Sequence, residues 1–481
     1  MNELNVEVAI IGAGSAGMSA YRAARAHTDR IVVIEAGEYG TTCARVGCMP
    51  SKLLIAAADA AHAVEAAGRF GIRTNTALID GKAVMQRVRA ERDRFVSFVV
   101  ETVEAWPEAH RLRGQARFIT PNKLNVGGHA VVEADRIVIA TGSRPHVPPG
   151  WRGTLGERLL VNDDVFSWTD LPGSVAVIGS GVIGLELSMA LARLGVRVRL
   201  FGRGGRVGPL SDPDVTAKAR AIVTSSFNAS LDADDIVPAR RRDHVTLRWT
   251  ESGARHEEDF DYVLAATGRV PLIEGLDLYR SGIALDSKGV PRADRFTRRI
   301  GKSHIFIAGD ASDEVSVLHE ASDEGRIAGD NAGRYPAVIA RPRRASLSVV
   351  FSEPQIAIAG ESHAALKARG ARFAVGSASF DDQGRSRVMG RNAGMVRLYG
   401  EAGSGRFLGA EMIGPAAEHI GHLLSWSVQH QLTVQQMLDS PFYHPVVEEG
   451  VRTALRDLKR ELNLPPPPLA TCLDCTPAGS V

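Results

Sequence analysis

Four cysteines stand in the 481-residue sequence as two close pairs, Cys43 with Cys48 and Cys472 with Cys475. A disulfide scaffold uses more cysteines, spread along the chain, whereas close pairs in a large protein indicate redox chemistry or metal binding. Pro50 suits the first turn of a helix, so Cys48 is expected at a helix N-terminus, where the helix dipole stabilises a thiolate. A thiolate is the form that attacks a disulfide. We therefore predict redox chemistry at the first pair, with buried structural thiols as the alternative.

Two segments, residues 8–35 and 175–201, repeat one design that could position such chemistry. Each has an apolar strand, a glycine turn, a helix-like stretch and a second strand. Such glycines permit a tight turn and let the backbone approach a pyrophosphate at the helix N-terminus. The glycines are Gly12, Gly14 and Gly17 in the first segment and Gly179, Gly181 and Gly184 in the second. Two copies predict two nucleotide-binding domains; the alternative is glycines that serve only close packing.

The remaining chain has no glycine fingerprint of this kind. Residues 341–464 mix strand-like runs, such as 346–351, with amphipathic helices expected around 420–430 and 447–462. Residues 465–481 begin with four prolines and end in small residues, which predicts a stiff spacer followed by a mobile tail.

Composition excludes several classes of protein. Hydrophobic residues make up 44% and charged residues 23% of the chain, as in ordinary globular domains. The net charge of +2 gives no reason to expect a nucleic-acid partner. No apolar run reaches the length of a membrane span, and the N-terminus lacks a signal-peptide pattern. We therefore expect no membrane partner and a cytoplasmic location.

Residues 40–52, around the first cysteine pair, resemble the disulfide motif of the class I pyridine nucleotide-disulfide oxidoreductases, which include dihydrolipoyl dehydrogenase, glutathione reductase and mercuric reductase. The resemblance extends to about Leu464. Thr41 is a departure, because the family usually has a second glycine there. Further segments resemble the two crossovers, the flavin-ribityl motif and the dimerisation domain: 140–145, 266–271, 307–310, 318–321, 351–354 and 409–418.

The resemblance implies an α/β fold with two Rossmann-like dinucleotide-binding domains plus a C-terminal α+β dimerisation domain. An FAD-binding domain would comprise residues 1–150 and 272–340, and an NAD(P)-binding domain residues 151–271. The dimerisation domain would comprise residues 341–464, followed by the proline-rich tail. A homodimer that binds FAD and acts on a small-molecule or protein disulfide is implied.

The resemblance also implies roles for single residues. Cys48 would form the charge-transfer contact with the flavin, and Cys43 would exchange with the substrate disulfide. Lys52 and Glu186 would pair near the flavin N5. Glu35 ends the second strand, where a carboxylate accepts hydrogen bonds from ribose hydroxyls. The rest of the cofactor site would include Thr141, Gly142, Gly268 and Asp310, the last holding the ribityl chain.

The implied catalytic base is His444, in the segment His444-Pro445-Val446-Val447-Glu448-Glu449. The family pattern is His-Pro with a glutamate five residues beyond the histidine, here Glu449. An imidazole near its working pKa moves a proton to and from a substrate thiol, while a carboxylate fixes its tautomer. In the family this histidine serves the cysteine pair of the other subunit. Val446 and Phe442 depart from the dihydrolipoyl dehydrogenase pattern and leave the substrate open.

The second nucleotide fold lacks the acid of the first. Gly202 stands where Glu35 stands in the first fold, and Arg203 and Arg206 follow. An acid there would select NADH, whereas arginines clamp a 2′-phosphate. We therefore predict NADPH, with NADH and a set of solvated loop arginines as the alternative.

The sequence is compatible with several substrates. The overall pattern favours a dihydrolipoyl dehydrogenase-like enzyme; the alternative is an NADPH-dependent disulfide reductase of the glutathione or thioredoxin type that uses Cys472 and Cys475. Mercuric reductase is disfavoured, because His444 and Glu449 are present and no metal-binding domain precedes the flavin domain. A non-catalytic flavoprotein is disfavoured by the complete set of redox residues. The tail pair is either a second redox station or incidental, and two cysteines alone make a poor zinc site, so no metal site is predicted.

Overall fold

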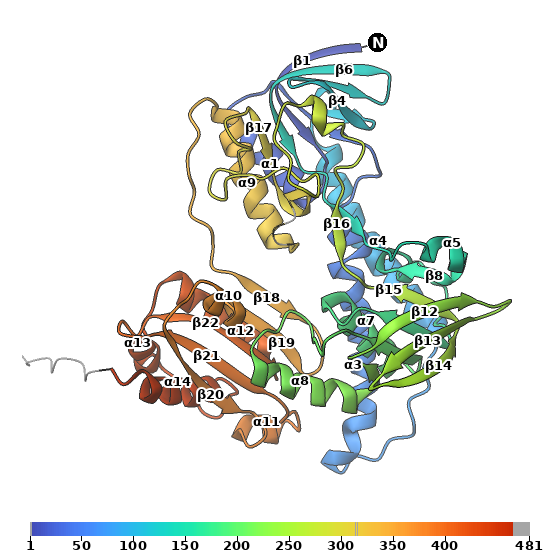
Figure 1. The fold of residues 1–481 in the computed structure, drawn as a ribbon, viewed down its shortest axis with the longest axis vertical. Helices are drawn as coiled ribbons and strands as arrows, with labels where there is room; N and C mark the ends of the chain where they lie inside the picture. Colours follow the sequence, from blue (N-terminus) through green and yellow to red (C-terminus); the bar gives the residue numbers. More distant parts are fainter. Residues whose placement is uncertain (1, 313, 315, 465–481) are drawn as a thin grey trace, which may run out of the picture. The chain divides into compact units, whose positions relative to one another are not determined.

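The computed structural model describes residues 2–312, 314 and 316–464. The chain divides into two compact units. The first holds the segments up to Pro209, Ala219–Arg344 and Val350–Glu353, and the second holds Leu210–Lys218, Ala345–Val349 and the chain from Pro354 onward. The mixed α/β architecture that the sequence predicts is present, and each unit is described by itself below (Figure 1).

The first unit begins with a seven-stranded sheet in the order β3-β2-β1-β6-β5-β4, with β17 also paired to β6. β1 runs parallel to β2 and β6, so that Val8 lies opposite Ile31 and Arg136. The last four residues of β1, Val8–Ile11, are buried on both faces, which explains their continuous apolar run. The strands are β1 (Asn2–Ile11), β2 (Ile31–Glu35), β3 (Arg111–Arg113), β4 (Ala116–Thr120), β5 (Lys123–Val126), β6 (Ala130–Ile139) and β17 (Ile305–Ile307).

Helices α1 (Ser15–Ala24) and α9 (Leu318–Arg334) lie side by side beside this sheet (Figure 1). Two glycines of α9 make the close approach possible. A Cβ on Gly325 would lie 2.1 Å from the carbonyl oxygen of Ala16, and one on Gly329 would lie 2.2 Å from that of Ala20. The helix that begins at the first glycine turn is therefore fixed against a helix some 300 residues later in the chain.

Three further helices connect β2 to β3: α2 (Thr42–Val46), α3 (Cys48–Ala66) and α4 (Gly81–Glu104). Helix α3 packs against α4 and against α7 (Val182–Arg193), which belongs to the second nucleotide fold. Short 3₁₀ turns occupy Ala67–Phe70, Glu108–His110, Gly156–Arg158, Leu278–Arg280 and Gly309–Ser312.

The second nucleotide fold is a five-stranded parallel sheet in the order β11-β10-β9-β15-β8. An antiparallel three-stranded sheet, β12 to β14, follows in the chain, and the crossover strands β7 and β16 pair with each other. The remaining bounds are β7 (Ser143–Pro145), α5 (Trp151–Leu155), β8 (Leu159–Val161), α6 (Asn162–Val165), β9 (Ser174–Ile178), β10 (Arg197–Phe201), α8 (Pro213–Ser226), β11 (Asn228–Ser230), β12 (Asp234–Arg240), β13 (Val245–Glu251), β14 (Ala254–Phe260), β15 (Tyr262–Ala265) and β16 (Arg269–Pro271).

The second unit is built on a five-stranded sheet in the order β18-β19-β22-β21-β20. Helix α14 packs on β20, where a Cβ on Gly376 would lie 2.3 Å from the carbonyl oxygen of Ala454. The two helices that the sequence predicts are present with shifted bounds, α12 (Ala417–Gln429) and α14 (Glu449–Leu462). The other elements are β18 (Leu347–Val350), β19 (Gln355–Gly360), α10 (His363–Ala368), β20 (Phe373–Ser379), α11 (Gly384–Val388), β21 (Met395–Glu401), β22 (Phe407–Gly414) and α13 (Val434–Asp439).

None of the helices in the described part of the chain has the length and hydropathy that crossing a bilayer requires.

Candidate active site

The first cysteine pair lies at the junction of two helices. Thr41 caps the short helix α2, because its Oγ1 accepts a hydrogen bond of 3.1 Å from the N–H of Ala44. This is the position at which the sequence departs from the resembled family, and the departure supplies a cap. Gly47 separates the helices, and α3 begins at Cys48. A half-buried Cys43 and an exposed Cys48, both free thiols, are thereby brought together.

The pKa values of the two thiols are shifted in opposite directions. The hydrogen bond from Cys43, and then the positive charge of Lys52, lower the pKa of Cys48 to about 7. The same hydrogen bond, followed by burial, raises the pKa of Cys43 well above its ordinary value. At neutral pH about half of the reduced pairs therefore hold a thiolate at Cys48, while Cys43 stays protonated and can act as a proton donor.

Lys52 forms an ion pair with Glu186, as the sequence predicts from the resemblance. Its Nζ lies 2.7 Å from Glu186 Oε2, and Glu186 is 4% exposed on α7. Phe351 completes the cluster in a way that sequence reasoning missed. Its N–H donates a 3.0 Å hydrogen bond to Glu186 Oε1, and its ring centroid lies 4.5 Å from Lys52 Nζ.

The first glycine turn has the shape of a pyrophosphate cradle. A Cβ on Gly12, which has φ +107°, would lie 2.4 Å from the Ala140 carbonyl oxygen, and one on Gly17 would lie 1.8 Å from the Gly12 carbonyl oxygen. Gly14, at the N-terminus of α1, faces open space instead, with no atom within 4 Å of an added Cβ. Backbone N–H groups at a helix N-terminus with free space before them suit an anion.

Other polar groups around this turn also fit a dinucleotide. Glu35 Oε2 accepts a 2.7 Å hydrogen bond from the N–H of Ala13, which holds the carboxylate at the end of β2. Thr141 Oγ1 is buried and has no hydrogen-bond partner within the described part of the chain. Asp310 lies in the 3₁₀ turn after β17, where it accepts a 2.6 Å hydrogen bond from Ser143 Oγ. Gly142 and Gly268, in the two crossovers, both have positive φ. These carboxylates, the unpartnered hydroxyl of Thr141 and the open space at the glycine turn fit FAD.

The second glycine turn repeats the geometry of the first. A Cβ on Gly179 would lie 2.3 Å from the Ala266 carbonyl oxygen, and one on Gly184 would lie 1.8 Å from the Gly179 carbonyl oxygen. Gly181 again faces open space. The repeated strand, turn and helix thus provide a second helix N-terminus whose geometry suits an anion.

At the start of the loop after β10, the side chain of Ser180 occupies the space beside Gly202. A Cβ on Gly202 would lie 2.7 Å from Ser180 Oγ, so a larger residue would require Ser180 to move. Ser180 Oγ donates a 2.7 Å hydrogen bond to the Arg206 carbonyl and holds the loop against the turn. The side chains of Arg203 and Arg206 are exposed, and neither guanidinium forms an ion pair within residues 2–464 that the structure describes.

In the second unit, His444 and Glu449 form the predicted pair. His444 Nδ1 lies 3.0 Å from Glu449 Oε2, and 81% of the imidazole is exposed. Partial burial opposes ionisation of Glu449, but the hydrogen bond from His444 and the charge of Arg452 outweigh it and lower its pKa. An ionised carboxylate only accepts hydrogen bonds, so Nδ1 carries the hydrogen and Nε2 is left for proton exchange.

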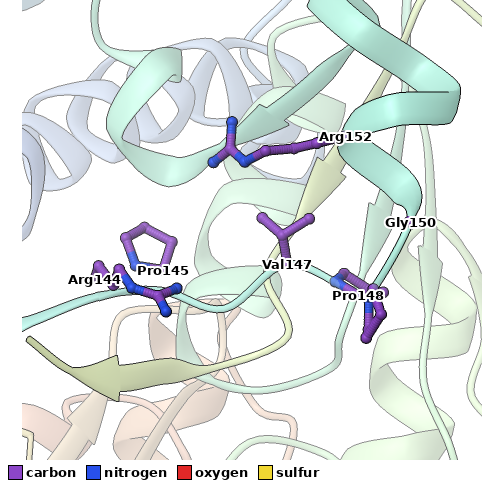
Figure 2. A pocket seen from close by; sticks show the side chains of 7 residues that line it. Arg144, Pro145, Val147, Pro148, Gly150 and Arg152 are labelled. Atoms are coloured by element: carbon purple, nitrogen blue, oxygen red, sulfur yellow. The ribbon is translucent and has the colours of Figure 1, made fainter. Parts of the chain in front are cut away.

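A cavity of about 410 Å³ lies beside the first crossover (Figure 2). Arg144 and Arg152 border it with Val147 between them, and Arg144 pairs with Glu274 at 2.7 Å. None of the predicted catalytic residues lines this cavity. Cys472 and Cys475 lie outside the residues that the structure describes.

Comparison with known proteins identifies the family. The model of the pyridine nucleotide-disulphide oxidoreductase domain matches residues 6–325, and that of the family's dimerisation domain matches residues 346–455. A mercuric reductase of Acidithiobacillus ferrooxidans is 30% identical over 95% of this chain and 83% of its own length. A dihydrolipoyl dehydrogenase of Bacillus subtilis is 28% identical over 93% of this chain and 97% of its own.

A solved structure of the HOCl-induced flavoprotein disulfide reductase RclA from Escherichia coli, a Cu(II) complex, shares the fold. It has a TM-score of 0.79 at 23% identity and covers 95% of this chain and 99% of its own. The predicted family, fold class and enzyme class are thus confirmed. The chain belongs to the pyridine nucleotide-disulphide oxidoreductase family, as a homodimeric FAD-dependent disulfide oxidoreductase that uses NAD(P)H.

Proposed function

We propose that this enzyme is dihydrolipoyl dehydrogenase-like and moves electrons between NADPH, FAD, the Cys43–Cys48 disulfide and a thiol/disulfide substrate. The observation that carries the proposal is the pair of free thiols at the junction of α2 and α3, with Cys48 at the start of the helix that carries the Lys52–Glu186 ion pair. The lowered pKa of Cys48 and the raised pKa of Cys43 agree with it. When bound, FAD supplies the two-electron carrier between the nicotinamide and this disulfide.

His444 carries out the proton transfer, and Cys43 and Cys48 carry out the thiol–disulfide exchange. His444 Nε2 takes the proton of Cys43, whose thiolate attacks one sulfur of the substrate disulfide; the S–S bond breaks, and the leaving thiolate takes the proton from His444. Cys48 next attacks Cys43 Sγ, releases the second thiolate, which takes a proton from water, and forms the Cys43–Cys48 disulfide. The two electrons given up are restored by NADPH, so that NADPH, one proton and one disulfide yield NADP⁺ and two thiols. As the resemblance implies, we assign His444 to the cysteine pair of the other subunit.

The cysteine assignment is tested with single and double serine variants of the FAD-loaded enzyme. Lipoamide, glutathione disulfide, thioredoxin and mercuric ion are each assayed with NADH and with NADPH, and dihydrolipoamide is assayed with NAD⁺ and with NADP⁺. We expect Cys43→Ser and Cys48→Ser to abolish turnover of the preferred disulfide, while reduction of ferricyanide by the nicotinamide persists. Disulfide turnover at the wild-type rate in the double variant would refute the assignment.

The choice of NADPH rests on Arg203, Arg206 and the occupied space beside Gly202. Charge-assisted hydrogen bonds from guanidinium groups to a 2′-phosphate are stronger than neutral ones. We expect Arg203→Ala with Arg206→Ala to lower the kcat/KM preference for NADPH over NADH by about 10- to 100-fold. Arg255→Ala, at an exposed position on β14, is the matched control and should leave the preference unchanged. A wild-type kcat/KM for NADH equal to that for NADPH would end this proposal.

A second candidate function is the NADPH-dependent reduction of a small or protein disulfide. The same arginine loop favours it, because NADPH generally serves reduction. The substrate panel separates the two: preference for dihydrolipoamide oxidation supports the first function, and preference for glutathione disulfide or thioredoxin supports the second. We infer a cytoplasmic location, where free thiols persist.

A further inference from the structure

The backbone between the two cysteines accepts a hydrogen bond from a residue more than 100 positions away. Asn162 Nδ2 donates to the Val46 carbonyl oxygen at 3.1 Å, and Asn162 is 6% exposed. Val46 is the last residue of α2, where a helical carbonyl lacks a partner in its own helix. An amide from the second nucleotide fold therefore holds the end of the helix that carries Cys43.

This hydrogen bond continues into a chain of polar contacts. Asn162 Oδ1 lies 3.5 Å from Arg269 Nη1, and Arg269 Nε donates a 2.8 Å hydrogen bond to Ser143 Oγ. Ser143 Oγ in turn donates to Asp310 Oδ2 at 2.6 Å. The contacts run from the redox loop, through both crossovers, to the residue predicted to hold the ribityl chain.

The Val46 carbonyl belongs to the same planar peptide as the N–H of Gly47, so fixing the carbonyl fixes the Val46–Gly47 peptide, one residue before Cys48. The turn at Gly47 leaves little room for a side chain, because a Cβ there would lie 3.0 Å from the Thr42 carbonyl oxygen. The direction in which the chain leaves α2 towards Cys48 therefore depends on the partner of Val46. That direction sets how the sulfur meets Cys43 and Lys52.

We propose that Asn162 is a positioning residue for the redox pair: it holds the Val46–Gly47 peptide between the two cysteines and links the loop through Arg269 and Ser143 to Asp310. This inference rests on the redox role proposed for Cys43 and Cys48. It assigns a function to a residue of the nicotinamide-side fold that touches neither sulfur.

The test measures thiol reactivity in the reduced, FAD-loaded enzyme. Alkylation by iodoacetamide is followed by mass spectrometry across a pH series, and the midpoint reports the thiolate of Cys48. We expect Asn162→Ala to raise this midpoint by about one pH unit, which is about a tenfold smaller thiolate fraction below it. Asn162→Leu, which keeps side-chain volume without the amide, provides the same test if the alanine variant does not fold.

Asn331→Ala is the matched control. Asn331 is fully buried, and its amide also holds backbone carbonyls, those of Thr297 and Ile339, each at 3.0 Å. This variant should lose thermal stability comparably and keep the wild-type alkylation midpoint. An unchanged midpoint in the Asn162 variants, or an equal shift in Asn331→Ala, overturns the inference. If the oxidised wild type forms no Cys43–Cys48 disulfide, the proposed function fails as well.

Discussion

Cys48 and Lys52 stand four residues apart on α3, so the ammonium group lies on the same helix face as the thiol. The charge of Lys52 lowers the pKa of Cys48, and that of Glu186 raises it. We therefore predict opposite effects from two substitutions. Lys52→Met should raise the midpoint of Cys48 alkylation above about 7, and Glu186→Gln should lower it. The measurement is the pH dependence of iodoacetamide modification, and shifts of the same sign in both variants would contradict this electrostatic account.

Sequence motifs located the cysteines, Lys52 and Glu186, but not the polar chain around them. Asn162 contacts Val46 across 116 positions, and Ser143 contacts Asp310 across 167. Such a contact depends on how two folded segments meet, and an asparagine after a strand has no local signal that predicts it. Phe351 is a similar case: its motif predicted a dimerisation-domain signature, whereas its N–H group serves Glu186.

At the scale of elements, each of the two strand–turn–helix segments contains glycines that backbone atoms crowd and one glycine that faces open space. A Cβ on Gly184 would overlap a backbone oxygen at 1.8 Å, whereas one on Gly181, with φ −75°, would meet no protein atom. We predict that Gly184→Ala lowers the thermal midpoint of the protein. Gly181→Ala should fold normally and weaken NAD(P)H binding, because the methyl group fills the space reserved for the pyrophosphate.

The measurements are thermal unfolding and nicotinamide titration of the FAD-loaded protein. Gly195→Ala is unsuitable as a control because its φ is +85°; Gly153→Ala, with no neighbour within 4 Å and no positive φ, serves instead. Full nicotinamide affinity in Gly181→Ala would show that the ligand does not approach this turn.

The same elements show where sequence patterns lose information. The apolar strands and glycines predicted both nucleotide folds, because their periodicity is local. The pattern did not predict α2, since five residues are too few for a helical period, and the N-cap Thr41 stands where a glycine was expected. Helix α3 begins at Cys48 immediately after a glycine that offers no side-chain cap, so only Pro50 marked its first turn.

At the scale of the whole molecule, the order of the chain does not match the order of the compact units. Leu210–Lys218 lies in sequence within the second nucleotide fold but belongs to the second unit. The cause is the fully buried carboxylate of Glu411, which accepts hydrogen bonds from the N–H groups of Ser211, Asp212 and His363 at 2.7, 2.9 and 2.8 Å. A buried acid with distant backbone partners leaves no local sequence pattern. From the sequence, residues 210–218 are therefore assigned to the NAD(P)-binding domain, to which the residues on either side of them in the sequence are assigned.

The homodimer provides the test at this scale. Leu423 and Trp426 lie one turn apart on α12, within the dimerisation domain, and remain 46% and 58% exposed in the single chain. Exposed apolar side chains of this size on a dimerisation domain are expected to be buried by the second subunit. We predict that Leu423→Glu with Trp426→Glu produces a monomer in analytical ultracentrifugation, whereas Val237→Glu, an exposed apolar position on β12, remains a dimer.

In the monomer, ferricyanide reduction by NAD(P)H can be compared with disulfide turnover. Reduction of ferricyanide by NAD(P)H requires only the nucleotide sites of one chain and should persist. Disulfide turnover requires His444 from the other subunit in the proposed mechanism, and loss of a general acid–base should lower it at least about 100-fold. A monomer that keeps full disulfide turnover would show that His444 serves the cysteine pair of its own chain. A dimer in the double glutamate variant would place the interface elsewhere, because two carboxylates in an apolar contact are strongly destabilising.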